Sequence, residues 1–133
     1  MAVIYEGFFL NCNITGALEK DVKYKHMTTE FRPKESHENL YGEFVVLHAS
    51  KYSIDINNEG YYIDRIVTVN DKLKKIFNEI SVPHVTLSTS VNGKPIDTAK
   101  LDFDKGIPID IYLPAKYGCF TGIEYIMKNK EEK

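Results

Sequence analysis

The sequence predicts one α+β domain built mainly from antiparallel sheet. Runs of β-branched and aromatic residues recur along the chain and are separated by turn-forming residues, which is typical of strands. Only residues 71–80 carry a clear helical spacing of apolar side chains. A length of 133 residues suits a single domain, which we assign to residues 1–127, followed by a polar tail at residues 128–133.

The expected strands follow one another along the chain, separated by proline, glycine and asparagine. They cover residues 3–10, 23–31, 43–56, 61–69, 84–90, 99–103, 107–113 and 118–126. Residues 57–60 read Asn-Asn-Glu-Gly, which predicts the turn of a hairpin. A short helix is also expected within residues 13–22, although its apolar face is thin.

The helix at residues 71–80 is the clearest element. Its apolar side chains recur at i, i+3, i+4 and i+7, at Leu73, Ile76, Phe77 and Ile80. Asn70 is a natural N-cap, because its side-chain oxygen can accept from the free amides of the first turn. Pro83 prevents the helix from continuing.

Charge and cysteine content narrow the range of partners and compartments. A net charge of −2 provides no basic surface for long duplex nucleic acid, whereas a small charged substrate or a strand end remains suitable. Cys12 and Cys119 form no CxxC pair or disulfide framework, which predicts a reducing, cytoplasmic location. We expect no signal peptide and no membrane partner, because the first residues are not basic and no apolar run reaches the length of a membrane span.

Two of the 4 histidines open the same tripeptide, His-x-Thr. They are His26, followed by Thr28, and His84, followed by Thr86. Residues two apart in a strand share a face, so each threonine is expected beside its histidine. Ser88 continues the His84 face and could either extend the same site or make a cross-strand hydroxyl contact.

The other face of these two strands is expected to be core. Met27 and Val85 lie between the histidine and the threonine of each tripeptide, and the alternation puts Phe31 and Leu87 on the same face.

Paired histidines and threonines suit displacement at phosphorus. One group must take a proton from the nucleophile and another must give a proton to the leaving oxygen, and histidine can do both near neutral pH. Threonine hydroxyls and nearby amides can donate hydrogen bonds to the non-bridging oxygens. No metal or other cofactor is required. Histidine and threonine are both common in strands, so ordinary packing is the alternative for either tripeptide alone.

Two segments resemble the motifs of the two-histidine (2H) phosphoesterase superfamily. Residues 83–98 read Pro-His-Val-Thr-Leu-Ser-Thr-Ser-Val-Asn-Gly-Lys-Pro-Ile-Asp-Thr and resemble the second motif, most closely in the phosphodiesterase modules of some tRNA ligases and other RNA-repair proteins. Residues 25–33 resemble the first motif, including its Phe and Pro. The likeness covers residues 24–101.

The resemblance implies a fold and an activity. The implied fold is bilobal, with two mostly antiparallel sheets and few short helices around a central cleft. The implied activity is metal-independent hydrolysis of a nucleotide 2′,3′-cyclic phosphate or of a cyclic phosphate at an RNA end. His26 and His84 would be the acid and base, and Thr28 and Thr86 the phosphate-binding residues. Ser88 is a phosphate-binding candidate on other grounds, because it shares the strand face of His84.

Several further side chains are candidates for contacts to a base or ribose, with packing or solvation as the alternative for each. They are Tyr5, Phe9, Arg32, Tyr117, Phe120 and Glu124, of which Tyr5 and Phe9 are implied by the resemblance. His37 and His48 fall outside both motifs and are expected at the surface or at a sheet edge. No HExxH or paired spacing predicts a metal site.

Two alternatives remain open at this point. Small 2H enzymes also hydrolyse cyclic dinucleotide signalling molecules, in some cases to counter host defence. A protein of another class, a nucleotide- or RNA-binding module without turnover, could keep the same fold.

Overall fold

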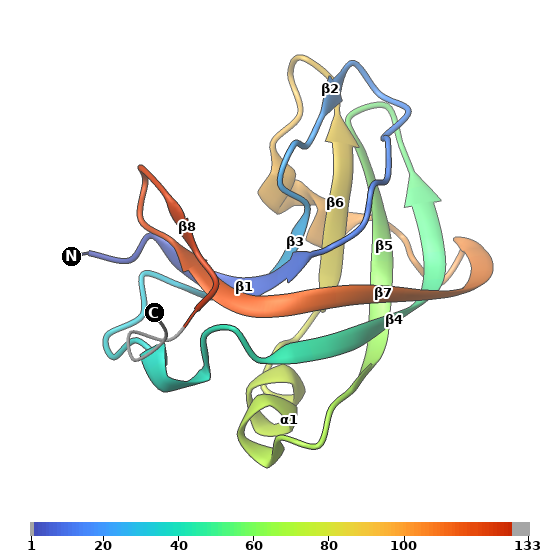
Figure 1. Ribbon diagram of the computed structural model, residues 1–133. Coiled ribbons are helices and arrows are strands. Elements are labelled where there is room, and N and C mark those ends of the chain that lie inside the picture. Colours follow the sequence, from blue (N-terminus) through green and yellow to red (C-terminus); the bar gives the residue numbers. More distant parts are fainter. Residues whose placement is uncertain (1, 129–133) are drawn as a thin grey trace.

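A single antiparallel sheet of eight strands organises residues 2–128, the part of the chain that this computed structural model describes (Figure 1). The strand order is β2-β6-β5-β4-β7-β1-β3, and β8 pairs with β7. The strands are β1 (Tyr5–Leu10), β2 (Lys20–Asp21), β3 (His26–Phe31), β4 (Phe44–Ile54), β5 (Asn58–Val67), β6 (His84–Thr89), β7 (Ile107–Phe120) and β8 (Tyr125–Ile126). The helical elements are α1 (Asp71–Asn78) and the 3-10 turns η1 (Glu38–Leu40) and η2 (Pro95–Lys100).

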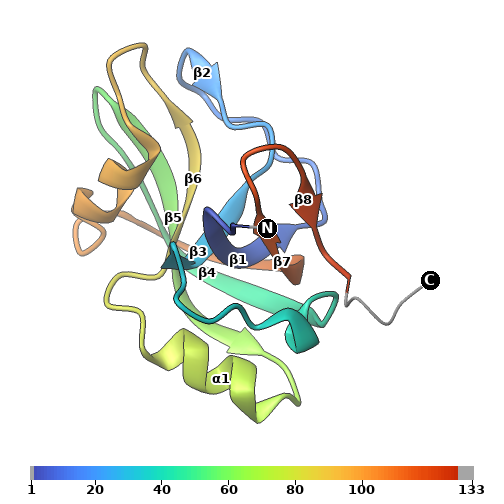
Figure 2. The ribbon, with the colours of Figure 1, turned by 90° about the vertical axis from the view of Figure 1, so that its left-hand side faces the viewer.

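The sheet curls until strands from its two ends lie side by side. β3 is the last strand in the order and β6 stands next to the other end, yet the two are in contact (Figures 1 and 2). Register shifts interrupt the pairing at Glu6/Gly7, at Glu59/Gly60 and around Ala49. Such bulges bend a strand and increase its twist, which helps the sheet to curl.

The core fills the inside of this curl. Phe8, Met27, Leu47, Val85 and Tyr117 come from five different strands, and none of them is exposed to solvent. Their position follows from the alternation of strand side chains, and it confirms that Met27 and Val85 face the core.

The helix α1 lies beyond one end of the sheet, at the bottom of Figure 1, and buries Leu73 and Phe77. The predicted N-cap is confirmed, because the side-chain oxygen of Asn70 accepts hydrogen bonds from the amides of Lys72 (3.0 Å) and Leu73 (3.2 Å).

The α+β class with a dominant antiparallel sheet is confirmed, but the expected division into two sheets is not. β7 joins the two halves, because its residues 107–116 pair with β4 and its residues 115–120 pair with β1. The two strands expected at residues 107–113 and 118–126 are therefore one long strand, followed by the short β8.

Two other local predictions are wrong. Residues 13–22 contain no helix and form only the short strand β2, consistent with their thin apolar face. Residues 99–103 do not form a strand, since the 3-10 turn η2 begins at Pro95, whose fixed φ suits a first helical turn.

The hairpin turn expected at residues 57–60 ends earlier in the structure than predicted. The carboxylate of Asp55 accepts from the amides of Asn57 (2.8 Å) and Asn58 (2.7 Å), and β5 begins at Asn58. Beyond Lys128, the polar tail expected at residues 128–133 lies outside the described residues. Among residues 2–128, no helix is both long enough and apolar enough to cross a membrane.

Candidate active site

The contact between β3 and β6 brings the two motif histidines together. His26 is the first residue of β3 and His84 the first residue of β6, and both side chains are partly buried. Burial lowers the pKa of His26, and the charge of His84 lowers it further against the opposing effect of the Tyr24 carbonyl. The two imidazoles are therefore close enough for their charges to interact.

Both rings are held by the same local hydrogen bond. Nδ1 of His26 donates to the carbonyl of Tyr24 (2.9 Å), and Nδ1 of His84 donates to the carbonyl of Val82 (2.7 Å). A carbonyl oxygen can only accept, so the proton of a neutral ring lies on Nδ1. Nε2 of each ring is then left with a lone pair for proton transfer.

The pKa of His84 is also lowered, chiefly by burial, while the Val82 carbonyl raises it. A lowered pKa makes each protonated imidazole a stronger acid than an exposed histidine. The pair therefore matches the electrostatic requirements of general acid–base chemistry.

Thr28 has an available hydroxyl. It is partly buried, and Met27 before it points into the core, so Thr28 shares the face of His26 as the alternation predicts. Within residues 2–128 its hydroxyl makes no hydrogen bond to protein. It can therefore donate to a bound anion without breaking an internal contact.

Thr86 is held differently. Its side chain is buried, and its Oγ1 lies 2.9 Å from the carbonyl of Pro95 and 2.8 Å from Oγ1 of Thr98. Thr98 in turn accepts from the side-chain amide of Asn58 (3.1 Å). The hydroxyl of Thr86 thus links β6 to η2, and it is already occupied before any ligand binds.

Ser88 is fully buried and makes the cross-strand contact that was one of its two alternatives. Its hydroxyl donates to Oε1 of Glu59 (2.6 Å), which is its direct partner across the β5–β6 pair. It also accepts from the amide of Leu18 (3.0 Å), so the loop before β2 covers it.

Aromatic side chains surround His26. Tyr5 and Phe9 project from the neighbouring strand β1, with ring centroids 4.5 Å and 5.4 Å from that of His26. Phe120, at the end of β7, stands 5.5 Å from Tyr5. The structure thus places two of the predicted base-contact residues against His26 and a third, Phe120, against Tyr5.

Two further tyrosines, neither of them among the predicted base contacts, complete this group. Tyr125 of β8 lies 4.5 Å from Phe120 and 5.5 Å from Phe9, and Tyr24 lies 4.3 Å from Tyr125. We call the five rings the aromatic cluster; they are Tyr5, Phe9, Tyr24, Phe120 and Tyr125. Tyr24 lies two residues before His26 in the sequence, whereas Tyr125 reaches the group through the pairing of β8 with β7.

Three other candidates lie apart from the histidine pair. Tyr117 is fully buried, and its hydroxyl lies 3.3 Å from a carboxylate oxygen of Glu6. Arg32 is exposed, with a positive φ of 49°, and its guanidinium lies over the ring of Phe31. Glu124 is exposed in the turn between β7 and β8.

Phe31 is 63% exposed, so its assignment to the core is wrong, whereas Leu87 is buried as predicted. The register shift in β1 aligns Gly7 with Thr28 and Glu6 with Glu30, which leaves one extra residue in β3. The alternation therefore reverses after Thr28, and Phe31 lies opposite Tyr5 on the exposed side.

His48 is not a surface residue as expected, because it is buried between two carboxylates. Its Nδ1 lies 2.6 Å from Asp64 and its Nε2 lies 2.6 Å from Asp110. Both carboxylates can only accept, so this geometry requires a doubly protonated imidazolium. The hydrogen bonds to Asp110 and Asp64 raise the pKa of His48.

A comparison with protein-family models finds no match for this chain, and neither does a comparison with curated proteins.

The ion-paired His48 predicts a specific pH dependence of stability. Its folded pKa is raised above the unfolded value of about 6.5, so its contribution is complete below that pH and is lost as pH rises through the folded pKa. The free energy of unfolding of the wild type, minus that of His48→Gln, should be largest near pH 5.5 and should decrease above about pH 6.5. Urea unfolding across this range measures the difference, and a constant or increasing difference would contradict the ion pairing.

Proposed function

We propose that this protein is a metal-independent phosphodiesterase that hydrolyses a nucleotide 2′,3′-cyclic phosphate or a cyclic phosphate at an RNA end. The observation that carries the proposal is that the rings of His26 and His84 have the same hydrogen bonding and the same direction of pKa shift. Each ring donates Nδ1 to the carbonyl two residues before it, and burial lowers the pKa of each. The resemblance of both motifs to those of 2H phosphoesterases supports the same activity.

In the proposed reaction, Nε2 of one histidine takes a proton from water as the water oxygen attacks phosphorus. The bond between phosphorus and one ribose oxygen breaks, and that oxygen receives the proton of the other, protonated histidine. The product is a phosphomonoester with a free ribose hydroxyl. Repulsion between two imidazolium charges disfavours double protonation, since the charge of His84 lowers the pKa of His26. The second proton is therefore bound more weakly than the first, which leaves a pH range in which one ring is the acid and the other is the base.

The two threonines have unequal roles in this proposal. Thr28 donates its free hydroxyl to a non-bridging phosphate oxygen. Thr86 can do so only by giving up its contact with the Pro95 carbonyl, so we assign it mainly to holding β6 against η2. Ser88 is enclosed by Glu59 and the amide of Leu18 and takes no part in binding phosphate.

The aromatic cluster supplies a surface for the nucleobase. Stacking of a base on an aromatic ring contributes about 1–3 kcal/mol and tolerates any base, because every base presents a π-face. The pKa of Tyr5 is raised by burial and by Tyr125, so its hydroxyl stays neutral at physiological pH. We propose that the β1–β3 and β5–β6 regions act as the two lobes of the cleft, and that the enzyme works in the cytoplasm on a small nucleotide or an RNA end.

The first prediction from this proposal concerns the two histidines. His26→Gln and His84→Gln should each lower kcat on a nucleoside 2′,3′-cyclic phosphate by about 10²- to 10⁴-fold, because each removes a proton-transfer group. A chelator should leave the wild-type rate unchanged. His37→Gln is the matched control, since His37 lies outside both motifs, and it should keep the wild-type rate.

Products should be identified by mass spectrometry on a panel that includes mononucleotide cyclic phosphates, RNA with a cyclic-phosphate end, and cyclic dinucleotides. Turnover of cyclic dinucleotides alone would favour the signalling-nucleotide alternative. Tight binding without product from any substrate would favour a non-catalytic binding module. Wild-type rates in both glutamine variants would refute the mechanism.

A second prediction separates the two threonines. Thr28→Val should lower kcat/KM by about tenfold with little change in stability, because it removes a hydroxyl that has no internal partner. Thr86→Val should lower the free energy of unfolding by about 1–3 kcal/mol, because it removes the buried hydrogen bonds of the Thr86 hydroxyl with the Pro95 carbonyl and with Thr98. Steady-state kinetics and urea unfolding of both variants test this. The assignment would be contradicted if Thr28→Val lost stability but kept its kcat/KM, while Thr86→Val lost kcat/KM but kept its stability.

A further inference from the structure

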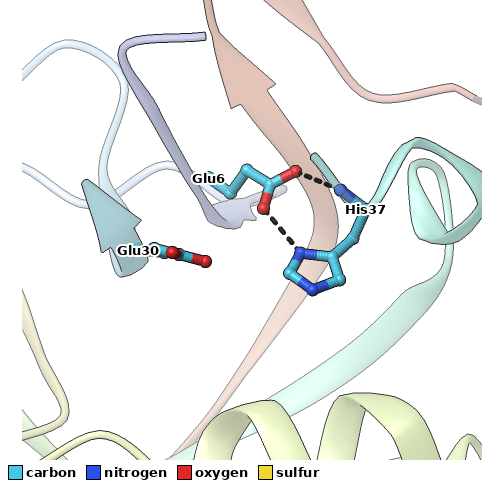
Figure 3. A group of neighbouring side chains, drawn as sticks. All are labelled: Glu6, Glu30 and His37. Atoms are coloured by element: carbon cyan, nitrogen blue, oxygen red, sulfur yellow. Dashed lines mark hydrogen bonds and ion pairs between the residues drawn. The ribbon is translucent and has the colours of Figure 1, made fainter. Parts of the chain in front are cut away.

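Glu6, Glu30 and His37 form a group of potential metal ligands outside the histidine pair. They come from β1, from β3 and from the segment before η1, and one ligand atom of each lies within 4.8 Å of the others. Figure 3 shows the two carboxylates and the imidazole directed toward a shared space. Because the three residues belong to separate segments of the chain, no local sequence motif indicates the group.

Glu6 is the most firmly held member. Its side chain is fully buried, and its carboxylate accepts from the amide (2.7 Å) and Nδ1 (2.8 Å) of His37 and from the hydroxyl of Tyr41 (2.6 Å). Buried carboxylates usually pair with a cation. Within residues 2–128, no lysine or arginine forms an ion pair with Glu6, and His37 is its one possible charged partner.

Glu30 adds a second negative charge at the same place. It is the direct cross-strand partner of Glu6 in the β1–β3 pair, and like charges in that position are destabilising. In the described part of the chain, the carboxylate of Glu30 forms no hydrogen bond or ion pair that would offset the repulsion.

The group opens onto solvent. Glu30 and His37 line a hollow of about 480 Å³ beside α1, together with Thr29, Glu79 and Ser81. The hollow gives an ion a route to the buried Glu6, and it leaves room for water on the ion.

We propose that Glu6, Glu30 and His37 bind a divalent transition-metal ion of the Zn²⁺ type. Two carboxylate oxygens and one imidazole nitrogen match the donors that Zn²⁺ takes, whereas Mg²⁺ and Ca²⁺ prefer oxygen ligands alone. Three protein ligands leave a fourth position toward the hollow. The two positive charges of the ion would offset the negative charges of the two opposed carboxylates, Glu6 and Glu30.

The proposed metal site is separate from the histidine pair. Successive side chains of a strand point to opposite faces, so Tyr5, which stacks on His26, and Glu6 lie on opposite faces of β1. The ion would tie β1, β3 and the segment before η1 together, and it takes no part in the proposed hydrolysis.

The test is calorimetric titration of the chelator-treated full chain with ZnCl₂, and with MnCl₂ and MgCl₂ for comparison. The wild type should bind one Zn²⁺ and should melt at a higher temperature when Zn²⁺ is present. Glu30→Gln and His37→Gln should each weaken Zn²⁺ binding by at least about tenfold and should lose the thermal shift. Glu35→Gln is the matched control, because Glu35 is an exposed glutamate in the same segment, and it should behave as the wild type.

The double variant His26→Gln/His84→Gln distinguishes this site from the histidine pair, and it should still bind one Zn²⁺. The proposal is overturned if the wild type binds no Zn²⁺, if Glu30→Gln and His37→Gln bind it as tightly as the control, or if the double variant loses the ion. Cyclic-phosphate hydrolysis by Glu30→Gln should equal that of the wild type, whether or not Zn²⁺ is present.

Discussion

The approach of β3 to β6 is the constraint on which the candidate active site depends. Five strand spacings separate these strands in the order β6-β5-β4-β7-β1-β3. On a flat sheet, at about 4.8 Å a spacing, they would lie roughly 24 Å apart. The curl, increased by the register shifts in the β1–β3, β4–β5 and β5–β6 pairs, removes that separation, so the charge of His84 acts on His26. Without the curl, the two histidines would be too far apart to act on one substrate.

The two sides of the site differ in how they are held. On the His26 side, the hydroxyl of Thr28 is free and the aromatic cluster stands beside the ring. On the His84 side, Thr86 and Ser88 are enclosed by polar contacts to η2 and to the buried carboxylate of Glu59. The first side is therefore suited to recognising a ligand, and the second provides a rigid support for the opposing histidine.

Features that depend on local alternation could be predicted from the sequence, and features that depend on distant contacts could not. Met27 and Val85 are core residues as expected, because side-chain alternation is a property of each strand alone. Phe31 was misassigned, since a bulge reversed the alternation. The partners of His48 lie 16 and 62 residues away, so no pattern around that histidine indicated its burial. The single sheet likewise results from the unbroken length of β7.

The most direct test of the central claim is the pH dependence of kcat/KM for a nucleoside 2′,3′-cyclic phosphate. Burial lowers the pKa of both histidines, so the profile should be bell-shaped, with both limbs below the ordinary histidine value of about 6.5. The rate should fall at low pH as the base becomes protonated, and it should already be falling at about pH 6.5, because the acid loses its proton below that pH. A rate that does not vary with pH, or that rises steadily through neutrality, would contradict a two-histidine mechanism.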